Sequence, residues 1–507
     1  MRFAPEIPPG LNSDDTAFSA SPAWADCNNA RFRLGRPQAT AGWESVIGDL
    51  LTGVCRSVFA WTDNGNVLNL GFGTHSALML YQGGALYDIT PTSGFTPGQI
   101  DGTGSTGYGT GAYGAGGYGE PSTTDYFPLT WSQAALGQTL LASPRNQTIF
   151  QWSNNTAVKA AALTNAPANV TYMIVARDFV FALGCNQEVS GTFNPLCIRH
   201  SDVRGPTGWS TVATSSSTSR EYILPGGGRI VAGREIGRSI LVWTNHSLYL
   251  GTYVGSVNKV WQFDKVGDKC GLIGPGAAVV KDSTAYWISP DRQFHSYTVG
   301  GMVSSIPCPI RESFADNLAA SQGDKIIAST IAEYGEVRWD YPDSRDGYEN
   351  SRYITLCVEG PDSGAWSRGD VARTAMVDAG PSAYPCGTTY EGNIYWHEKG
   401  NSADGSALAG YIETSDIYLD TNRSSLVRGC WPDVSEQTGP WYLTLTTRDK
   451  PQGTGTTFGP YAMAPDEDKL DFKASGRLVR VKFSWNSSPA GGRLGVPSFD
   501  VKQRGRK

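Results

Sequence analysis

The 507-residue sequence has no long run of apolar side chains. A membrane-spanning helix needs ~18 or more such residues in succession, and no stretch approaches that length. The N-terminal stretch MRFAPEIPPGLNSDD also lacks the apolar centre of a secretory signal. We therefore expect neither insertion into a membrane nor a cleaved secretory leader.

Charge is scarce as well. Charged residues make up 17% of the chain, and the net charge is −6. A protein that grips DNA presents an excess of Lys and Arg to the phosphates, so this composition argues against general nucleic-acid affinity. It does not exclude DNA passing nearby, because a wall that does not hold phosphates lets a duplex slide past.

Paired cysteines and the common catalytic motifs are also missing. The nine cysteines are scattered with no Cys-x-x-Cys pair, which favours buried, reduced thiols in a protein made in a cytosol. No phosphate-binding loop, nucleophile elbow or zinc spacing is present. Only His397, beside Glu398, is a suggestive pair, and a hydrogen-bonded turn histidine is the commoner explanation. The sequence predicts no catalytic residue, no cofactor, no metal and no enzymatic activity.

One segment is unusually rich in glycine. GTGSTGYGTGAYGAGGYGE, residues 102–120, places Tyr108, Tyr113 and Tyr118 five residues apart and matches G-x-G-x-x-G twice. A dinucleotide site needs a buried strand before these glycines and a helix after them, and neither flank provides one. We predict instead an inserted loop whose tyrosines contact a neighbouring subunit or a partner. A flexible insertion without a partner is the alternative.

A loose hairpin motif recurs through the middle of the chain. An apolar strand, a polar turn and a second strand follow one another, beginning near residues 55, 138, 173, 239, 284, 325 and 387. Where nothing is inserted, the spacing is ~45 residues, the length of a four-stranded propeller blade. We therefore predict an all-β protein with a β-propeller over residues 46–430, with insertions at about 98–128 and 186–225.

The two ends differ from this core. Residues 1–45 are rich in Pro, Ser, Asp and Asn and predict an extended N-terminal arm. Arg31 and Arg33 are expected to dock this arm on an adjacent protein, unless they are ordinary solvated surface.

The last residues predict a small C-terminal β region. In 431–507, PWYLTLTTRD and GRLVRVKFSW alternate like strands around an acidic turn. They form either a separate unit or strands that complete the last blade. The basic tip is expected to contact DNA or an acidic partner through Lys502, Arg504, Arg506 and Lys507.

Several segments, in their order along nearly the whole chain, resemble a known family, the tail hub or nozzle proteins of short-tailed bacteriophages. These segments are PPGLNSDDT, DCNNARFRLGRPQATAGWE, the Tyr/Gly loop, CIRHSDVRGPTGW, LVWTNHSLYLGTYVGSVNKVWQFDKVGDKCGLIGPGA, AYWISPDRQFHSYTVGGMVSSIPCPIRESF, EVRWDYPD, YWHEKGNSADG and GRLVRVKFSW.

This resemblance implies a structural protein of the virion tail, assembled in the cytoplasm of the host bacterium. It implies a homo-oligomeric ring, a hexamer, below the portal and tail adaptor, which continues the DNA ejection channel and helps retain packaged DNA. Attachment of tail fibres or spikes is implied as well. A ring needs heterologous contacts between copies, for which exposed aromatic and glycine-rich loops are suited.

Two other functions fit a propeller. One is a glycan-active enzyme, a polysaccharide depolymerase or a sialidase-like protein, and the other is a host-receptor binding module. RHSDVRGPTGWS faintly resembles the Asp-box turn of sialidases, but its spacing is wrong because Asp202 directly follows Ser201. That turn shapes the fold and does no chemistry.

Overall fold

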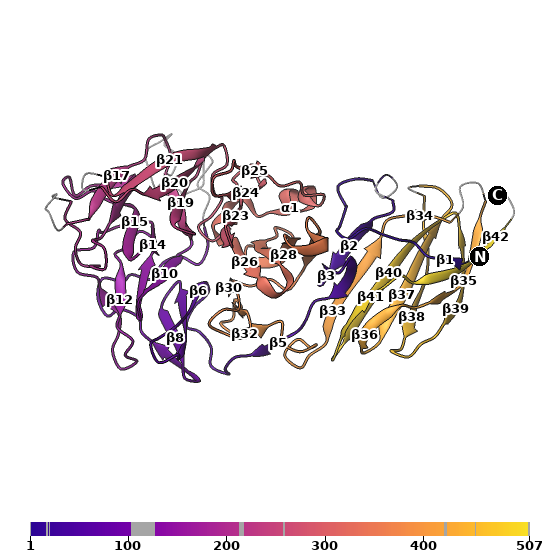
Figure 1. Ribbon diagram of the computed structural model, residues 1–507. Helices are drawn as coiled ribbons and strands as arrows, with labels where there is room; N and C mark the ends of the chain where they lie inside the picture. The colour runs from indigo at the N-terminus through magenta and orange to yellow at the C-terminus, as the bar shows by residue number, and fades with distance from the viewer. Residues whose placement is uncertain are drawn as a thin grey trace, which may run out of the picture.

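The computed structural model forms two β bodies, a propeller and a second unit beside it (Figure 1). Strands dominate both, and the helical elements are the short α1 (Arg311–Asn317) and the 3-10 turns η1 (Ala320–Lys325), η2 (Ala332–Tyr334) and η3 (Gly360–Asp362). The predicted all-β fold with a propeller core is confirmed. The structure describes residues 2–16, 19, 21–102, 127–211, 217–256, 259–419, 423–451 and 453–504.

Seven four-stranded antiparallel sheets form the blades of the propeller. The first three contain β6 (Cys55–Thr62), β7 (Leu68–Thr74), β8 (Leu78–Gln82) and β9 (Ala85–Asp88); β10 (Trp131–Leu136), β11 (Thr139–Pro144), β12 (Phe150–Trp152) and β13 (Ala161–Ala162); and β14 (Tyr172–Ala176), β15 (Phe179–Asn186), β16 (Phe193–His200) and β17 (Arg220–Ile223). Part of the expected insertion 186–225 therefore supplies the two outer strands of the third blade.

The next three blades repeat the same path. They contain β18 (Ile230–Ile236), β19 (Ser239–Thr244), β20 (Ser247–Tyr253) and β21 (Trp261–Asp268); β22 (Ala278–Lys281), β23 (Thr284–Ile288), β24 (Phe294–Thr298) and β25 (Ser304–Ser305); and β26 (Ile327–Ile331), β27 (Glu336–Pro342), β28 (Asn350–Cys357) and β29 (Trp366–Gly369). Each of the seven predicted hairpins falls in a different blade.

The seventh blade is completed by a strand from the N-terminal part of the chain. Its members are β30 (Ala375–Val377), β31 (Cys386–Thr388), β32 (Ile394–His397) and β5 (Trp43–Ser45). β5 pairs antiparallel with β32, so that Trp43 faces His397. The first inner strand, β6, contacts the last, β30, and the ring is closed.

Adjacent blades are held together by large buried side chains. Trp131 in β10 packs against Gly73 in β7, and its Nε1 donates a hydrogen bond to the carbonyl of Thr74 at 2.7 Å. A Cβ at position 73 would lie 2.4 Å from the indole, so only glycine allows this approach. Such contacts bury the faces that a single small sheet would leave open to water.

The second body combines both ends of the chain. One sheet has the order β1 (Arg2–Phe3), β42 (Ser498–Gln503), β35 (Ser425–Trp431) and β39 (Leu470–Gly476). Another has β2 (Trp24–Asn28), β33 (Leu408–Thr414), β40 (Leu478–Ser487), β37 (Trp441–Arg448) and β38 (Thr456–Met463), with β34 (Ile417–Tyr418) beside β40. The third has β3 (Ala30–Arg33), β4 (Arg36–Ala39), β41 (Gly491–Leu494) and β36 (Val434–Thr438).

The expected domain boundaries need correction. Residues 1–45 are not an extended arm, because their strands pair with C-terminal strands and β5 joins the propeller. The propeller ends at His397, and the second body resumes at Leu408 rather than near residue 431. The two predicted strands, β37 and β40, are neighbours in this second body. Strands from the two ends of the chain pair across hundreds of residues, so no local sequence pattern predicts that they are neighbours.

The second body sits against the sixth blade. Strands β2 and β3 contact its outer strand β29, and the chain ends are marked on the side away from the propeller (Figure 1). No helix in the described part of the chain is long and apolar enough to cross a membrane.

Candidate functional site

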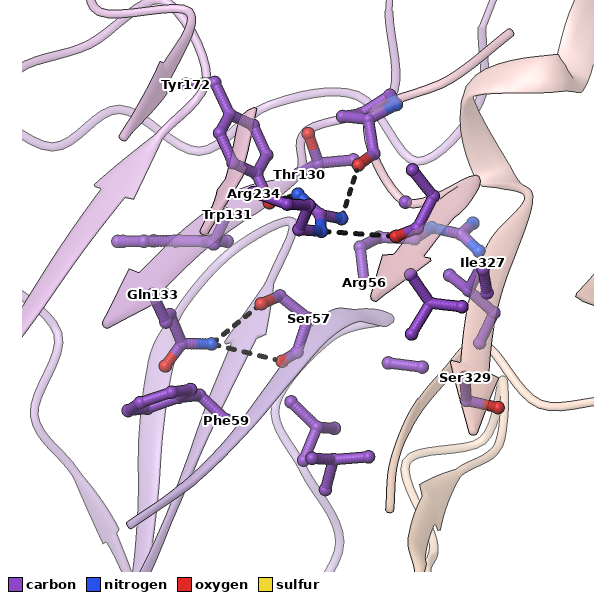
Figure 2. Close-up of a pocket in the computed structure, with 18 of the residues that line it drawn as sticks. Arg56, Ser57, Phe59, Thr130, Trp131, Gln133, Tyr172, Arg234, Ile327 and Ser329 are labelled. Carbon is purple, nitrogen blue, oxygen red and sulfur yellow. Dashed lines mark hydrogen bonds between the residues drawn. The ribbon is translucent and has the colours of Figure 1, made fainter. Parts of the chain in front are cut away.

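A cavity of about 460 Å³ lies on the axis of the propeller, between the inner strands of all seven blades (Figure 2). Each blade repeats the same path, so the N-terminal ends of the inner strands gather at one end of this channel, which we call the upper end. Their C-terminal ends gather at the other, the lower end. Apolar side chains line the middle, among them Val58, Ile174, Val279, Ile327 and Met376.

The upper end carries a buried ion network. Arg56, at the start of β6, binds Glu349 through two nitrogens at 2.6 and 2.7 Å. The ammonium of Lys325 lies 2.5 Å from Asp101 and 3.6 Å from Glu349. Burial would raise the pKa of Glu349, but the hydrogen bonds and charges of Arg56 and Lys325 outweigh it and lower that pKa. Glu349 is therefore held ionised between the two cations.

Arg234 is a second kind of cation in the same channel. Its Nε and Nη2 donate to the carbonyls of Ala278 and Pro275 at 3.2 and 2.9 Å. Its Nη1 donates to Gly233 and to the hydroxyl of Tyr172. Arg234, Thr130 and Arg56 all line this cavity and are labelled in Figure 2. Within the described residues, no carboxylate forms an ion pair with Arg234.

The lower end is acidic. Glu235 and Asp378 lie at the C-terminal ends of inner strands and line the cavity. Partial burial raises the pKa of Glu235, against the opposing effect of Arg177. Asp378 accepts hydrogen bonds from the Thr330 hydroxyl at 2.6 Å and from the backbone of Ala332. Neither carboxylate forms an ion pair with a cation in the part of the chain that the structure describes.

Residues of the linker between the first two blades lie at the upper mouth. Gly102 exchanges two hydrogen bonds with the buried amide of Gln322, at 3.1 and 2.6 Å. Gln322 belongs to η1, just before the inner strand of the sixth blade. The two preceding residues contact cations that line the channel: the carbonyl of Ile100 accepts a hydrogen bond from Arg56 at 3.2 Å, and Asp101 binds Lys325 at 2.5 Å. Residues 100–102 therefore lie at the upper mouth.

Phe127 anchors the return path of the same linker. Its ring lies beneath the guanidinium carbons of Arg145 and Arg229, at 4.0 and 4.4 Å from the ring centroid. Arg145 belongs to the second blade and Arg229 precedes the inner strand of the fourth. Phe127 therefore joins the second and fourth blades near the upper end of the channel. The predicted contact residues Tyr108, Tyr113 and Tyr118 fall between Gly102 and Phe127 in the sequence, outside the described residues.

A buried ion cluster joins the two bodies. Arg31 in β3 binds Glu398, which follows β32, at 2.8 and 2.6 Å, and its Nε lies 3.3 Å from Glu336 at the start of β27. The guanidinium also covers the ring of Tyr334 at 3.8 Å. All three charged side chains are almost fully buried. The prediction that Arg31 docks on an adjacent protein is therefore wrong, because its partners belong to its own chain.

Burial is the largest influence on the pKa values of Glu336 in this cluster and of His397 beside it. It raises the pKa of Glu336 to about 7, although Arg31 pulls in the other direction. His397 and Glu398 do not act as a pair: Nε2 of His397 accepts a hydrogen bond from Arg373 at 2.8 Å. Burial, followed by the charges of Arg373 and Arg338, holds the pKa of His397 well below its usual value.

The other predicted contact residues lie on the surface. Arg33 is exposed, with its guanidinium 5.2 Å from the centre of the Tyr334 ring. Lys502 is exposed near the end of the C-terminal strand β42, and Arg504 is exposed directly after that strand. Arg506 and Lys507 lie outside the described residues. Of the described cations, Arg33, Lys502 and Arg504 do not line the propeller channel.

The reactive side chains that sequence analysis considered have structural partners. Oδ1 of Asp202 accepts hydrogen bonds from the backbone of Thr218 and Ser219 at 2.6 and 2.8 Å, and so shapes a turn. Burial raises the pKa of Cys55 and Cys270 to about 11. Among the described residues, no three His, Cys, Asp or Glu side chains form a metal-binding group.

Sequence reasoning missed the channel residues. Arg56, Arg234 and Lys325 lie in three different blades, and their order in the chain gives no sign that they share one cavity. The available signal was weak. Arg56 and Lys325 stand at the start of two predicted hairpins, whose first strands are inner strands facing the common axis of the propeller. Arg234 lies in β18, before the predicted hairpin at residue 239.

Comparisons with known proteins add little beyond this geometry. No model of a known protein family matches the sequence, and no curated protein matches it. Among solved structures, BBS1N in complex with ARL6DN is 12% identical with a TM-score of 0.41, covering 71% of this chain and 98% of that chain. A chain of a mitotic checkpoint complex is 11% identical with a TM-score of 0.41, covering 73% and 99%. The designed protein Ika8 is 10% identical with a TM-score of 0.38, covering 70% and 100%. At these values, none of the three bears on function.

Proposed function

We propose that this chain is a structural subunit of the tail of a short-tailed bacteriophage, a hub or nozzle protein. Copies form a ring below the portal and adaptor, continue the path of the ejected DNA, help retain the packaged genome and offer surface for fibres or spikes. The ordered sequence resemblance suggests this family. The rigid joint between the two bodies is the structural observation that carries the proposal.

A ring subunit has to keep its shape under load, and the joint suits that need. Arg31 ties the second body to the sixth and seventh blades through Glu336 and Glu398. Beside it, Arg368 of β29 binds Asp26 of β2 at 2.7 Å. Buried ion pairs with several hydrogen bonds fix one geometry, since any other leaves charges without partners.

The propeller channel is not the conduit in this proposal. A cavity of about 460 Å³ lies within the ~300–1,000 Å³ range of small-molecule pockets, and residues 100–102 lie at its upper mouth. A DNA duplex, whose major groove alone is ~12 Å wide, has no room there. DNA would pass between copies, which requires a ring.

The test is assembly. We expect the purified protein, mixed with its portal and adaptor, to sediment as a complex that electron microscopy resolves as a ring. Replacing Tyr108, Tyr113 and Tyr118 together with serine should weaken this assembly, whereas Met302→Ser, a change at a side chain 85% exposed on the fifth blade, should not. Release of reducing sugar from a host polysaccharide, with no assembly, would favour the glycan-active alternative.

A further inference from the structure

We propose that the propeller channel binds a small ω-amino carboxylate, with its carboxylate on Arg234 and its ammonium between Glu235 and Asp378. An amino acid with a long side chain, or a short peptide, has this chemistry. The site lies among the inner strands of the propeller, apart from the joint between the two bodies, and the inference does not depend on the proposed tail function.

The upper end of the channel supplies one positive charge, on Arg234, that has no counter-ion among the described residues. A guanidinium has five N–H donors, and the contacts of Arg234 use four of them on neutral acceptors. One N–H of Nη2 and the whole charge remain for a ligand. The nearby cations Arg56, Lys325 and Arg145 are already paired with Glu349, Asp101 and Asp324.

This arrangement selects a monoanion over a dianion. A half-buried cation fixed by neutral groups is a preorganised site for a carboxylate, because no side chain has to move to receive it. A phosphate would bring a second negative charge toward Asp324, which also lines the cavity. The Asp324 carboxylate lies 3.2 Å from Arg145. That arginine balances the charge of Asp324 and leaves no positive charge for the second negative charge of a phosphate.

The middle and the lower end of the channel determine which chain and which second charged group the ligand carries. Val58, Ile174, Val279 and Met376 line the channel between its charged ends, and they favour a short apolar chain. At the lower end, the carboxylates of Glu235 and Asp378 attract a cation. A ligand with opposite charges at its two ends therefore matches the channel along its length.

The experiment is titration calorimetry of the full chain with three probes of matched length, namely 6-aminohexanoate, hexanoate and hexylamine. We expect 6-aminohexanoate to bind most tightly and hexanoate more weakly. Arg234→Gln should reduce the affinity for 6-aminohexanoate by roughly 10- to 100-fold, the effect of a charge-assisted hydrogen bond. Arg238→Gln, at an exposed position just after the same strand, should leave the affinity unchanged.

A double substitution tests the acidic lower end of the channel. Glu235→Gln combined with Asp378→Asn should bring the affinity for 6-aminohexanoate down to that for hexanoate. The wild-type probe series decides the matter even if a variant does not fold. Absence of binding by 6-aminohexanoate, or hexylamine binding as tightly, overturns the proposal. Equal affinity in folded Arg234→Gln overturns it as well.

Discussion

Arg31 binds Glu398 through both terminal guanidinium nitrogens, at 2.8 and 2.6 Å, although 367 residues separate the two along the chain. The first lies in β3 of the second body, and the second follows the last strand that the C-terminal half gives to the propeller. This ion pair therefore joins the second body, which is built from both ends of the chain, to the seventh blade, which closes the propeller.

Removing Arg31 should strongly destabilise the protein. Arg31→Ala leaves Glu398 and Glu336 buried without their cation, and breaking a buried pair in this way costs about 3–5 kcal/mol. Chemical denaturation followed by tryptophan fluorescence measures the change in the free energy of unfolding. Arg33→Ala, two residues along but exposed, should cost less than ~1 kcal/mol. Equal effects of the two substitutions would show that the joint does not depend on this ion pair.

Glu336 should make stability depend on pH. Burial raises the pKa of this carboxyl from 4.5 to about 7, so the folded state binds the proton more tightly than the unfolded chain. The resulting stability is fully present below pH 4.5 and is lost as the pH rises to about 7. Its size is at most about 3.5 kcal/mol, because each pKa unit corresponds to ~1.4 kcal/mol.

The measurement is the midpoint of urea unfolding between pH 4 and 8, for the wild type and for Glu336→Gln. Buried histidines with lowered pKa values, such as His397 and His200, change stability in the opposite direction. They do so in both proteins, so the difference between the two curves isolates Glu336. We expect the wild type to lose stability relative to the variant as the pH rises. Parallel curves would contradict the assignment.

The sequence predicted repeated elements well and distant pairings poorly. The seven hairpins could be recognised because an apolar strand, its turn and the next strand are neighbours in the chain, as in SILVWTNHSLYLG. The closing strand β5 is only three residues long, and its partner Trp396 lies far away in the chain. Nothing local in WES indicates that pairing.

The residues of the candidate site could not be predicted from the sequence for a similar reason. Arg31 stands near Arg33 and Arg36 in the sequence, and such a cluster indicates a docking or solvated surface. Its burial depends on Glu336 and Glu398, which only the folded chain brings to it. Arg234 gave no signal at all, since its neighbours Pro275 and Ala278 contribute only backbone carbonyls.

The cysteines should be unreactive in the native protein. Cys308 is the most accessible of the nine, and burial still raises its pKa to about 12. Because the thiolate is the reactive form, a disulfide reagent at pH 7.5 should label the native chain very slowly and all nine thiols in denaturant. Rapid labelling of even one thiol in the native protein would mean that a blade opens readily.

The contact between the first two blades should not tolerate a methyl group at Gly73. Gly73→Ala places a Cβ 2.4 Å from Trp131, and overpacking of this kind costs about 1–3 kcal/mol. Gly227→Ala is the matched control, since its Cβ would meet nothing within 4 Å. Thermal unfolding of both variants measures the difference. A Gly73→Ala protein as stable as the control would show that the indole can move away freely.

The central claim is that this rigid two-body chain is a building block of a tail ring. Electron microscopy of the purified protein, alone and together with its portal and adaptor, tests it most directly. The account predicts ring-shaped particles with an open centre, in which DNA would pass between propellers. Particles that stay single under every mixture, with no ring and no binding to the adaptor, would contradict it.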